Sequence, residues 1–184
     1  MEENNFFRQV KNWAYFRRSK DANKFSSKYI TPTKKCIQSI MVWGAIRGDG
    51  KRVIHKCDQN VNQYYYQAIL DQHLPNIYTT RYIFQQDGAP CHTARSTMEY
   101  FEKKHVCLMA AWPSHSPDLS IIENLWDSIK EKVRQRNPSD VEQLWPFVKE
   151  EFERFSDADF CKLFESLTKR INAVRLAKGG NTKY

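Results

Sequence analysis

The first third of the chain alternates short apolar runs with turn-forming residues, a pattern typical of β-strands. Residues 12–18 and 28–30 are strand-like, and the strongly apolar residues 37–46 predict a central strand. An Asp-Gly pair at 49–50 favours a hairpin turn. Residues 51–57 are expected to pair back, so this region is predicted to form a strand meander.

Helical and strand patterns alternate after the meander. Residues 61–74 predict a helix, with an asparagine before it as a possible N-cap, and residues 93–104 predict a second helix. The short apolar runs at 82–86 and 106–110 predict two further strands. A meander followed by alternating helices and strands indicates an α/β protein with a mixed sheet, rather than a doubly wound βαβ repeat.

From residue 120 the pattern is helical almost to the end, with breaks near 137–138 and 155–156. Two of these helices are predicted to begin with capping boxes, at Ser139 with Glu142 and at Ser156 with Asp159. The sheet is therefore expected to be flanked by helices, with a helical C-terminal part.

Length and composition predict one domain over residues 1–184, because 41% of the 184 residues are hydrophobic and 27% are charged. No apolar run approaches the roughly 18 residues of a membrane-spanning helix. The first residues lack the apolar segment of a secretory signal. The five cysteines are widely spread without a C-x-x-C pair, which favours ordinary thiols in a reducing compartment.

The positive charge is concentrated at one end of the chain. Residues 1–52 hold 12 Lys and Arg against 4 Asp and Glu, whereas residues 53–184 hold 17 of each kind. Cations interleaved with aromatic residues suit nucleic acid, although a solvated face of the meander would have the same composition. Four residues are the candidate phosphate contacts: Arg17, Arg18, Lys34 and Lys35.

Two acidic residues occupy positions at which a sheet commonly presents its ligands. Asp87 follows the predicted strand at 82–86, and Glu123 lies in the first turn of the helix that begins near Ser120. Such a pair could converge on one hard cation, because Mg²⁺ prefers oxygen ligands. Both residues also have structural explanations: Asp87 before a glycine is typical of a turn, and Ser120 with Glu123 has capping-box spacing.

Other catalytic classes receive no support from the sequence. His92 and His115 flank the same region, but a lone loop histidine more often forms an ordinary hydrogen bond than binds a ligand. The chain contains no G-x-S-x-G, no Walker A motif and no G-x-G-x-x-G.

Four blocks of sequence resemble the catalytic domain of mariner-superfamily DDE transposases, and they come in that family's order. They are IMVWGAI at 40–46, FQQDGAPCHT at 84–93, WPSHSPDLSIIENLW at 112–126 and AKGGNTKY at 177–184. The resemblance covers essentially the whole chain. It implies a ribonuclease-H-like fold, which agrees with the order of elements predicted above.

The resemblance also implies a catalytic triad in which Asp87 is the second acidic residue and Glu123 the third. Aligning Phe6-Phe7 with the family's first strand places Glu2 at the first triad position, where the family has aspartate. The triad would hold two Mg²⁺ or Mn²⁺ ions, and His92 would lie against the DNA. The implied partners are double-stranded DNA, at transposon ends and at the target, and a second copy of the chain, in the nucleus.

The chain departs from the family pattern at four points. The glutamate at position 2 is one methylene longer than aspartate, and a displacement of about an ångström can lower a rate roughly a hundredfold. The family's Asn-Pro before the third acid is replaced by Ser120-Ile121. The expected first strand is incomplete, and the family's N-terminal helix-turn-helix domain is absent from this sequence.

These departures leave three hypotheses open for the function. The first is a Mg²⁺-dependent endonuclease and strand transferase. The second is a catalytically inactive, decayed or domesticated nucleic-acid-binding module with the same fold. The third is a ribonuclease-H-type nuclease acting on RNA–DNA hybrids, which shares the fold but not the specific sequence blocks.

Overall fold

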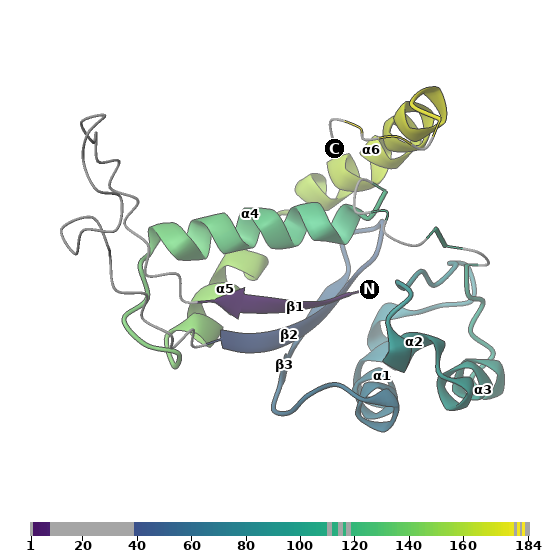
Figure 1. Cartoon of the computed structure of the whole chain (residues 1–184), viewed down its shortest axis with the longest axis horizontal. Helices are drawn as coiled ribbons and strands as arrows, with labels where there is room; N and C mark the ends of the chain where they lie inside the picture. The colour runs from purple at the N-terminus through teal and green to yellow at the C-terminus, as the bar shows by residue number, and fades with distance from the viewer. Residues whose placement is uncertain are drawn as a thin grey trace, which may run out of the picture.

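The fold is a layered α/β arrangement around a small antiparallel sheet (Figure 1). Its strands are β1 (Glu2–Phe7), β2 (Ser39–Ile46) and β3 (Arg52–Cys57), in the order β1-β2-β3. The computed structural model describes residues 2–7 (backbone alone), 39–109, 112–113, 116, 119–178, 180 and 182. The strands predicted at 12–18 and 28–30 lie outside these residues.

Strand β2 is the centre of the sheet because its residues are apolar on both faces. Val42 packs on one face into a core cluster with residues of α4 (Ile121–Gln135) and α5 (Leu144–Glu153). Trp43 packs on the other face into a second cluster with residues of α1 (Gln63–Ile77). Both side chains are fully buried. This confirms the predicted central strand and explains its continuous apolar run, since a strand covered on both faces does not alternate.

The helices of the middle region differ in detail from the sequence prediction. Helix α1 is capped by Asn62, whose side chain accepts hydrogen bonds from the N–H groups of Tyr64 and Tyr65, and it continues through Pro75 to Ile77. The single helix expected at 93–104 is instead two helices, α2 (Pro90–Thr93) and α3 (Arg95–Lys103). The chain divides there because Ala94 has an extended ψ of 140° and serves as the N-cap of α3.

The two further strands expected at 82–86 and 106–110 are reduced to one parallel bridge between Phe84 and Leu108. The Phe84 N–H donates to the Cys107 carbonyl at 2.8 Å, and the Met109 N–H donates to the Phe84 carbonyl at 2.8 Å. Ile83, the residue before Phe84, is 60% exposed, so the packing that would stabilise a longer strand there is missing. The bridge nevertheless fixes the chain immediately before Asp87.

The C-terminal helices cover the sheet and extend beyond it (Figure 1). The predicted apolar stripe of α4 is confirmed, since all five of its residues are buried: Ile122, Leu125, Trp126, Ile129 and Val133. Ser120 is the N-cap of α4, but its side chain makes no capping hydrogen bond, so the Ser120–Glu123 box is not formed. The box predicted at Ser139 is also wrong, because α5 begins at Leu144.

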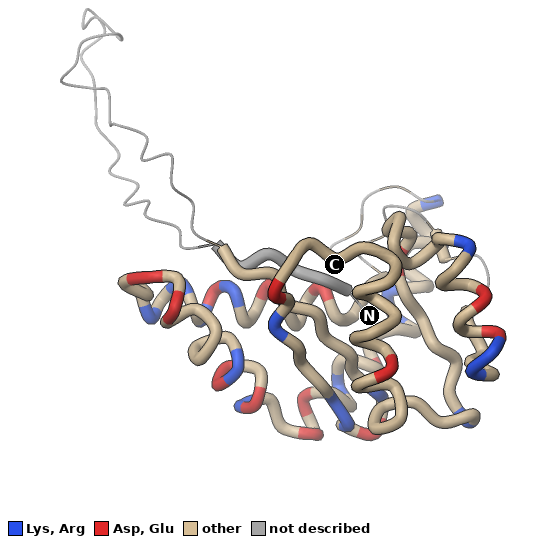
Figure 2. The backbone as a smooth tube through the Cα atoms, turned by 90° about the horizontal axis from the view of Figure 1, so that it is seen from below, with Lys and Arg blue, Asp and Glu red and all other residues tan. Residues whose placement is uncertain are grey.

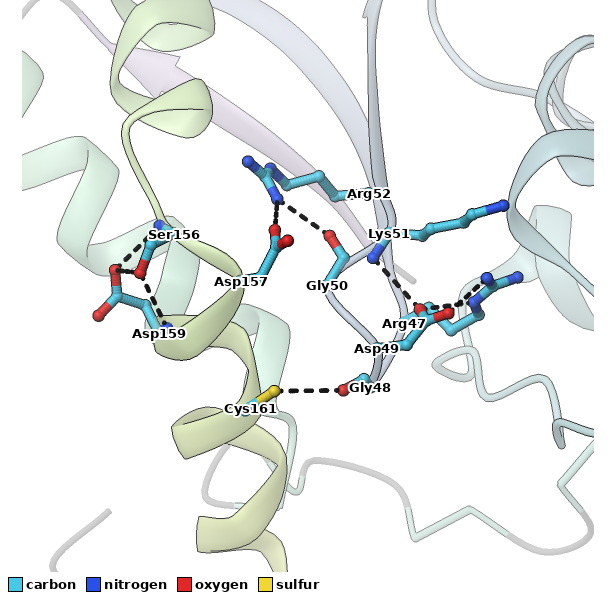
Figure 3. Close-up of polar contacts among 10 residues, drawn as sticks. All are labelled: Arg47, Gly48, Asp49, Gly50, Lys51, Arg52, Ser156, Asp157, Asp159 and Cys161. Carbon is cyan, nitrogen blue, oxygen red and sulfur yellow. Dashed lines mark hydrogen bonds and ion pairs between the residues drawn. The ribbon is translucent and has the colours of Figure 1, made fainter.

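The remaining predicted cap is confirmed at the start of α6 (Asp157–Leu176), where Ser156 and Asp159 form a reciprocal box. Figure 3 shows this helix start beside the β2–β3 turn. Arg52 Nη1 lies 2.7 Å from Asp157 Oδ1, and the Cys161 thiol lies 3.7 Å from the Gly48 carbonyl oxygen. The contacts attach α6 to the tip of the hairpin.

The charges of the described helices are mixed. Figure 2 shows acidic and basic residues interspersed along them, consistent with the balanced charge of residues 53–184. Within the part of the chain that the structure describes, no helix is both long and apolar enough to cross a membrane.

Candidate active site

Asp87 follows the bridge segment, and its carboxylate is held by groups from the next five residues. Oδ1 accepts a hydrogen bond from the Ala89 N–H at 3.0 Å and lies 2.5 Å from Nδ1 of His92. Burial alone would raise the pKa of this carboxyl, but the His92 and Ala89 hydrogen bonds outweigh it and lower the pKa below its ordinary value. Asp87 is therefore an anion at neutral pH, with a side chain that is 42% exposed.

His92 lies beneath this carboxylate and is 1% exposed. Its ring lies 4.3 Å, centroid to centroid, from the ring of Tyr66 on α1. Gln86 links the same two residues: its Oε1 accepts from the Tyr66 hydroxyl at 2.8 Å, and its Nε2 donates to the His92 carbonyl at 3.1 Å. His92 is thus a buried hydrogen-bond partner of Asp87. Its contact with DNA remains a prediction.

Glu123 lies in the first turn of α4, where its side chain is partly buried. Helix α4 approaches the sheet closely at Gly44 of β2, where an added Cβ would lie 2.6 Å from the ring of Trp126. Only glycine therefore allows α4 to lie at this distance from the sheet. This packing sets the distance between the sheet and α4, the helix that carries Glu123.

One cavity of about 120 Å³ is lined by residues that precede Asp87 and Glu123, but neither candidate carboxylate is among its lining residues. Its lining includes Gln85, two residues before Asp87, and Ile122, the residue before Glu123. The end of β2, at Ile46, also lines it. In Figure 1 the start of β1 and the first turn of α4 lie at the same end of the sheet as α2.

The third predicted carboxylate, Glu2, is placed through its backbone alone. Residue 2 pairs with Gly44 in the β1–β2 register, so β1 begins opposite the point where α4 approaches the sheet. Among the residues whose side chains are described, no group of three or more His, Cys, Asp or Glu could hold a metal ion. The predicted phosphate contacts Arg17, Arg18, Lys34 and Lys35 lie outside the described residues, as does His115.

Sequence reasoning missed two functional candidates, Tyr66 and Gln86. Gln86 stands beside Asp87 in the QQD block, so its position was a usable signal. Tyr66 lies 20 residues earlier on a different helix, and only the folded structure brings its hydroxyl to Gln86. Cys91 and Cys107 form no disulfide within the part of the chain that the structure describes.

Comparisons with known proteins identify the family that the chain resembles. The model of the DDE superfamily endonuclease family matches residues 4–145. The transposase of the Caenorhabditis briggsae element Tcb2 is 32% identical over 150 residues, which are 79% of this chain and 55% of that protein. The transposase of the Caenorhabditis elegans element Tc1 is 29% identical over 168 residues, 88% of this chain and 61% of that protein. The chain thus spans a little over half the length of these relatives.

Solved structures of the Mos1 mariner transposase have the same fold. Its catalytic domain aligns with a TM-score of 0.67 at 20% identity, covering 79% of this chain and 77% of that one. Its strand transfer complex aligns with a TM-score of 0.75 at 19% identity, covering 98% of this chain and 54% of that one. The Mos1 catalytic domain is also known with Mn and with Mg. The likeness confirms the expected ribonuclease-H-like fold.

Proposed function

This chain belongs to the DDE superfamily endonuclease family, and on that premise we propose that it is the catalytic domain of a DNA transposase. It would cleave DNA at transposon ends and join those ends to target DNA. The observation that carries the proposal is the Asp87 carboxylate, which is ionised, half-exposed and fixed at the segment that shares a cavity with the start of α4.

Asp87 fits the role of a ligand to a divalent cation. Both hydrogen bonds to Asp87 end on Oδ1, so Oδ2 takes part in neither. An ionised carboxylate oxygen of this kind is a hard ligand of the type that Mg²⁺ and Mn²⁺ prefer. We propose that Asp87 and Glu123, with Glu2 at the first triad position, hold two such ions. When bound, the ions would supply charge stabilisation to the attacking and leaving oxygens of an in-line displacement.

The protein's own part in the reaction is to hold its carboxylates and the DNA in fixed positions relative to one another. In the first step a water oxygen attacks a phosphodiester at the transposon end, which frees a 3′-hydroxyl. In the second step that hydroxyl attacks a phosphodiester of the target, so each bond formed replaces one broken and no covalent protein intermediate is needed. Arg17, Arg18, Lys34 and Lys35 would bind the DNA backbone, as the positive charge of residues 1–52 supports.

The assembly is proposed by analogy. Mos1 transposase is known in a paired-end complex with a transposon end. Two DNA ends require two active sites, so we propose that the chain acts as a homodimer on double-stranded DNA, and that it does so in the nucleus.

The test is Mg²⁺-dependent nicking of supercoiled plasmid DNA. Asp87→Asn removes the anionic ligand with little change in shape, so nicking should fall by at least a hundredfold. Asp58→Asn is the matched control, because Asp58 is exposed and takes no part in the hydrogen bonds that hold Asp87. Equal nicking by the parent and Asp87→Asn would refute the proposal. DNA binding that survives both chelation of Mg²⁺ and Asp87→Asn, without any nicking, would instead support a binding module.

A further inference from the structure

The contact between Asp87 and His92 joins the two side chains through one carboxylate oxygen. Oδ1 of Asp87 lies 2.5 Å from Nδ1 of His92 and also accepts a hydrogen bond from the Ala89 N–H at 3.0 Å. In the tautomer that carries its proton on Nδ1, His92 donates to this oxygen. Charge-assisted hydrogen bonds of this kind are short and roughly twice as strong as neutral ones.

The imidazole is itself fixed from two sides. Tyr66 is fully buried and covers the ring face, at 4.3 Å between centroids. Gln86 accepts from the Tyr66 hydroxyl and donates to the His92 backbone carbonyl. A further bond anchors the short helix, since the Thr97 hydroxyl donates to the Cys91 carbonyl at 2.8 Å. The ring therefore cannot turn away from Asp87 without breaking buried contacts.

We propose that His92 is a positioning residue for the divalent-ion site: it holds Asp87 by Oδ1 so that Oδ2 faces the ion, and Tyr66 and Gln86 hold His92. The inference rests on the proposed function, because it assumes that Asp87 binds the ion. A carboxylate with one oxygen fixed loses little rotational freedom when its other oxygen binds a cation. Hydrogen-bond partners of metal ligands typically contribute about 10- to 100-fold in metal affinity.

A histidine that only filled the core would behave differently. The pair formed by His55 and His73 is the comparison within this chain: His55 Nδ1 lies 3.0 Å from His73 Nε2, and burial lowers the pKa of both. Neither of these histidines contacts a carboxylate in the described hydrogen bonds. His73 is only partly buried and stacks on Trp43 at 5.7 Å between centroids, so replacing it tests a change from histidine to leucine that leaves the contacts of Asp87 in place.

The experiment measures Mn²⁺ binding to the full chain by the electron paramagnetic resonance signal of free Mn²⁺, together with thermal unfolding of each variant. His92→Leu keeps the apolar volume and removes the donor, so the dissociation constant should rise by about tenfold or more. His92→Asn places an amide N–H near the position of Nδ1 and should stay within about threefold of the parent. Tyr66→Phe, which loses only the hydroxyl, should weaken binding by about threefold. His73→Leu is the control and should bind Mn²⁺ as the parent does.

The outcomes separate the two proposals. If Asp87→Asn abolishes the site while His92→Leu binds Mn²⁺ like the parent, the positioning role is wrong and the proposed function stands. If His92→Asn and His92→Leu lose affinity equally and also melt equally early, His92 is a structural residue and the inference is again overturned. If Asp87→Asn itself binds Mn²⁺ like the parent, the proposed metal site fails and the inference falls with it.

Discussion

Replacing Gly44 with alanine should separate helix α4 from the sheet by a measurable amount. A Cβ at this position would lie 2.6 Å from Cζ2 and 2.8 Å from Cη2 of Trp126. An ordinary carbon–carbon contact is about 3.5 Å, so the ring or the strand must move by about 0.9 Å, the difference from 2.6 Å. Trp126 is fully buried and stacked against Phe152 at 6.1 Å between centroids, which leaves the ring little room to move alone.

The displacement should affect both stability and activity. Overpacking of a core typically costs about 1–3 kcal/mol, which corresponds to a fall in Tm of roughly 2–12 °C for a domain of this size. The same α4 carries Glu123, so a shift of its first turn would misplace that carboxylate. A misplacement of about 1 Å can cost roughly a hundredfold in rate. Differential scanning calorimetry and the DNA nicking assay measure the two effects on the same preparation.

Gly48→Ala is the matched control, because an added Cβ there would meet the Phe164 ring at 3.5 Å, an ordinary contact. It should melt and nick as the parent does. If Gly44→Ala melts within about 1 °C of Gly48→Ala, corresponding to less than roughly 0.5 kcal/mol, and nicks at the same rate, then the contact with Trp126 does not set the position of α4.

The remaining predictions concern the hairpin turn and the first triad position. Asp49 accepts hydrogen bonds at 2.7 and 2.6 Å from Arg47, which lowers its pKa to about 2. Asp49→Asn should therefore lower the free energy of unfolding at pH 6, as measured by urea unfolding. The difference from the parent should shrink as pH falls from 3.8 towards about 2, because the parent's carboxylate becomes protonated over this range. A difference that is the same at pH 6 and pH 2 would contradict this. Glu2→Asp introduces the aspartate that the family resemblance implies at the first triad position. It should raise the nicking rate by up to about a hundredfold, whereas an unchanged or lower rate would show that residue 2 is not the first triad residue.

The features predicted from sequence are those set by contacts of short range or by continuous burial. Strand β2 and the apolar stripe of α4 follow from patterns in which every buried position is itself apolar. The capping box at Ser156 was predicted because all its groups lie within four residues. Asp87 and Glu123 stood out by their places relative to these elements, although only the family resemblance favoured a metal site over turn and cap.

Features that depend on competition between neighbours, or on distant partners, were not predicted correctly. Near Ser139 the box pattern is present, but Asp140 Oδ1 accepts a hydrogen bond from the Gln143 N–H at 2.9 Å, and the helix begins at Leu144, four residues later than a cap at Ser139 predicts. The division of the helix at Ala94 has no local signal, because alanine favours helix strongly. The contact between Tyr66 and His92 joins residues 26 positions apart, and its chemistry appears only once α1 lies against α2.

The two described carboxylates depend on different parts of the structure, and this has a consequence for how variants should behave. Asp87 is fixed by Ala89 and His92, all within six consecutive residues, so its geometry withstands a small shift of the sheet. Glu123 depends on the packing of a whole helix against β2 through Gly44 and Trp126. Changes near His92 should therefore act first on ion affinity, whereas changes at Gly44 should act first on turnover, because they move one carboxylate relative to the other. If a Gly44 variant weakened Mn²⁺ binding as strongly as His92→Leu does, the positions of Asp87 and Glu123 would be coupled. Asp87 would then not be held by its neighbouring residues alone.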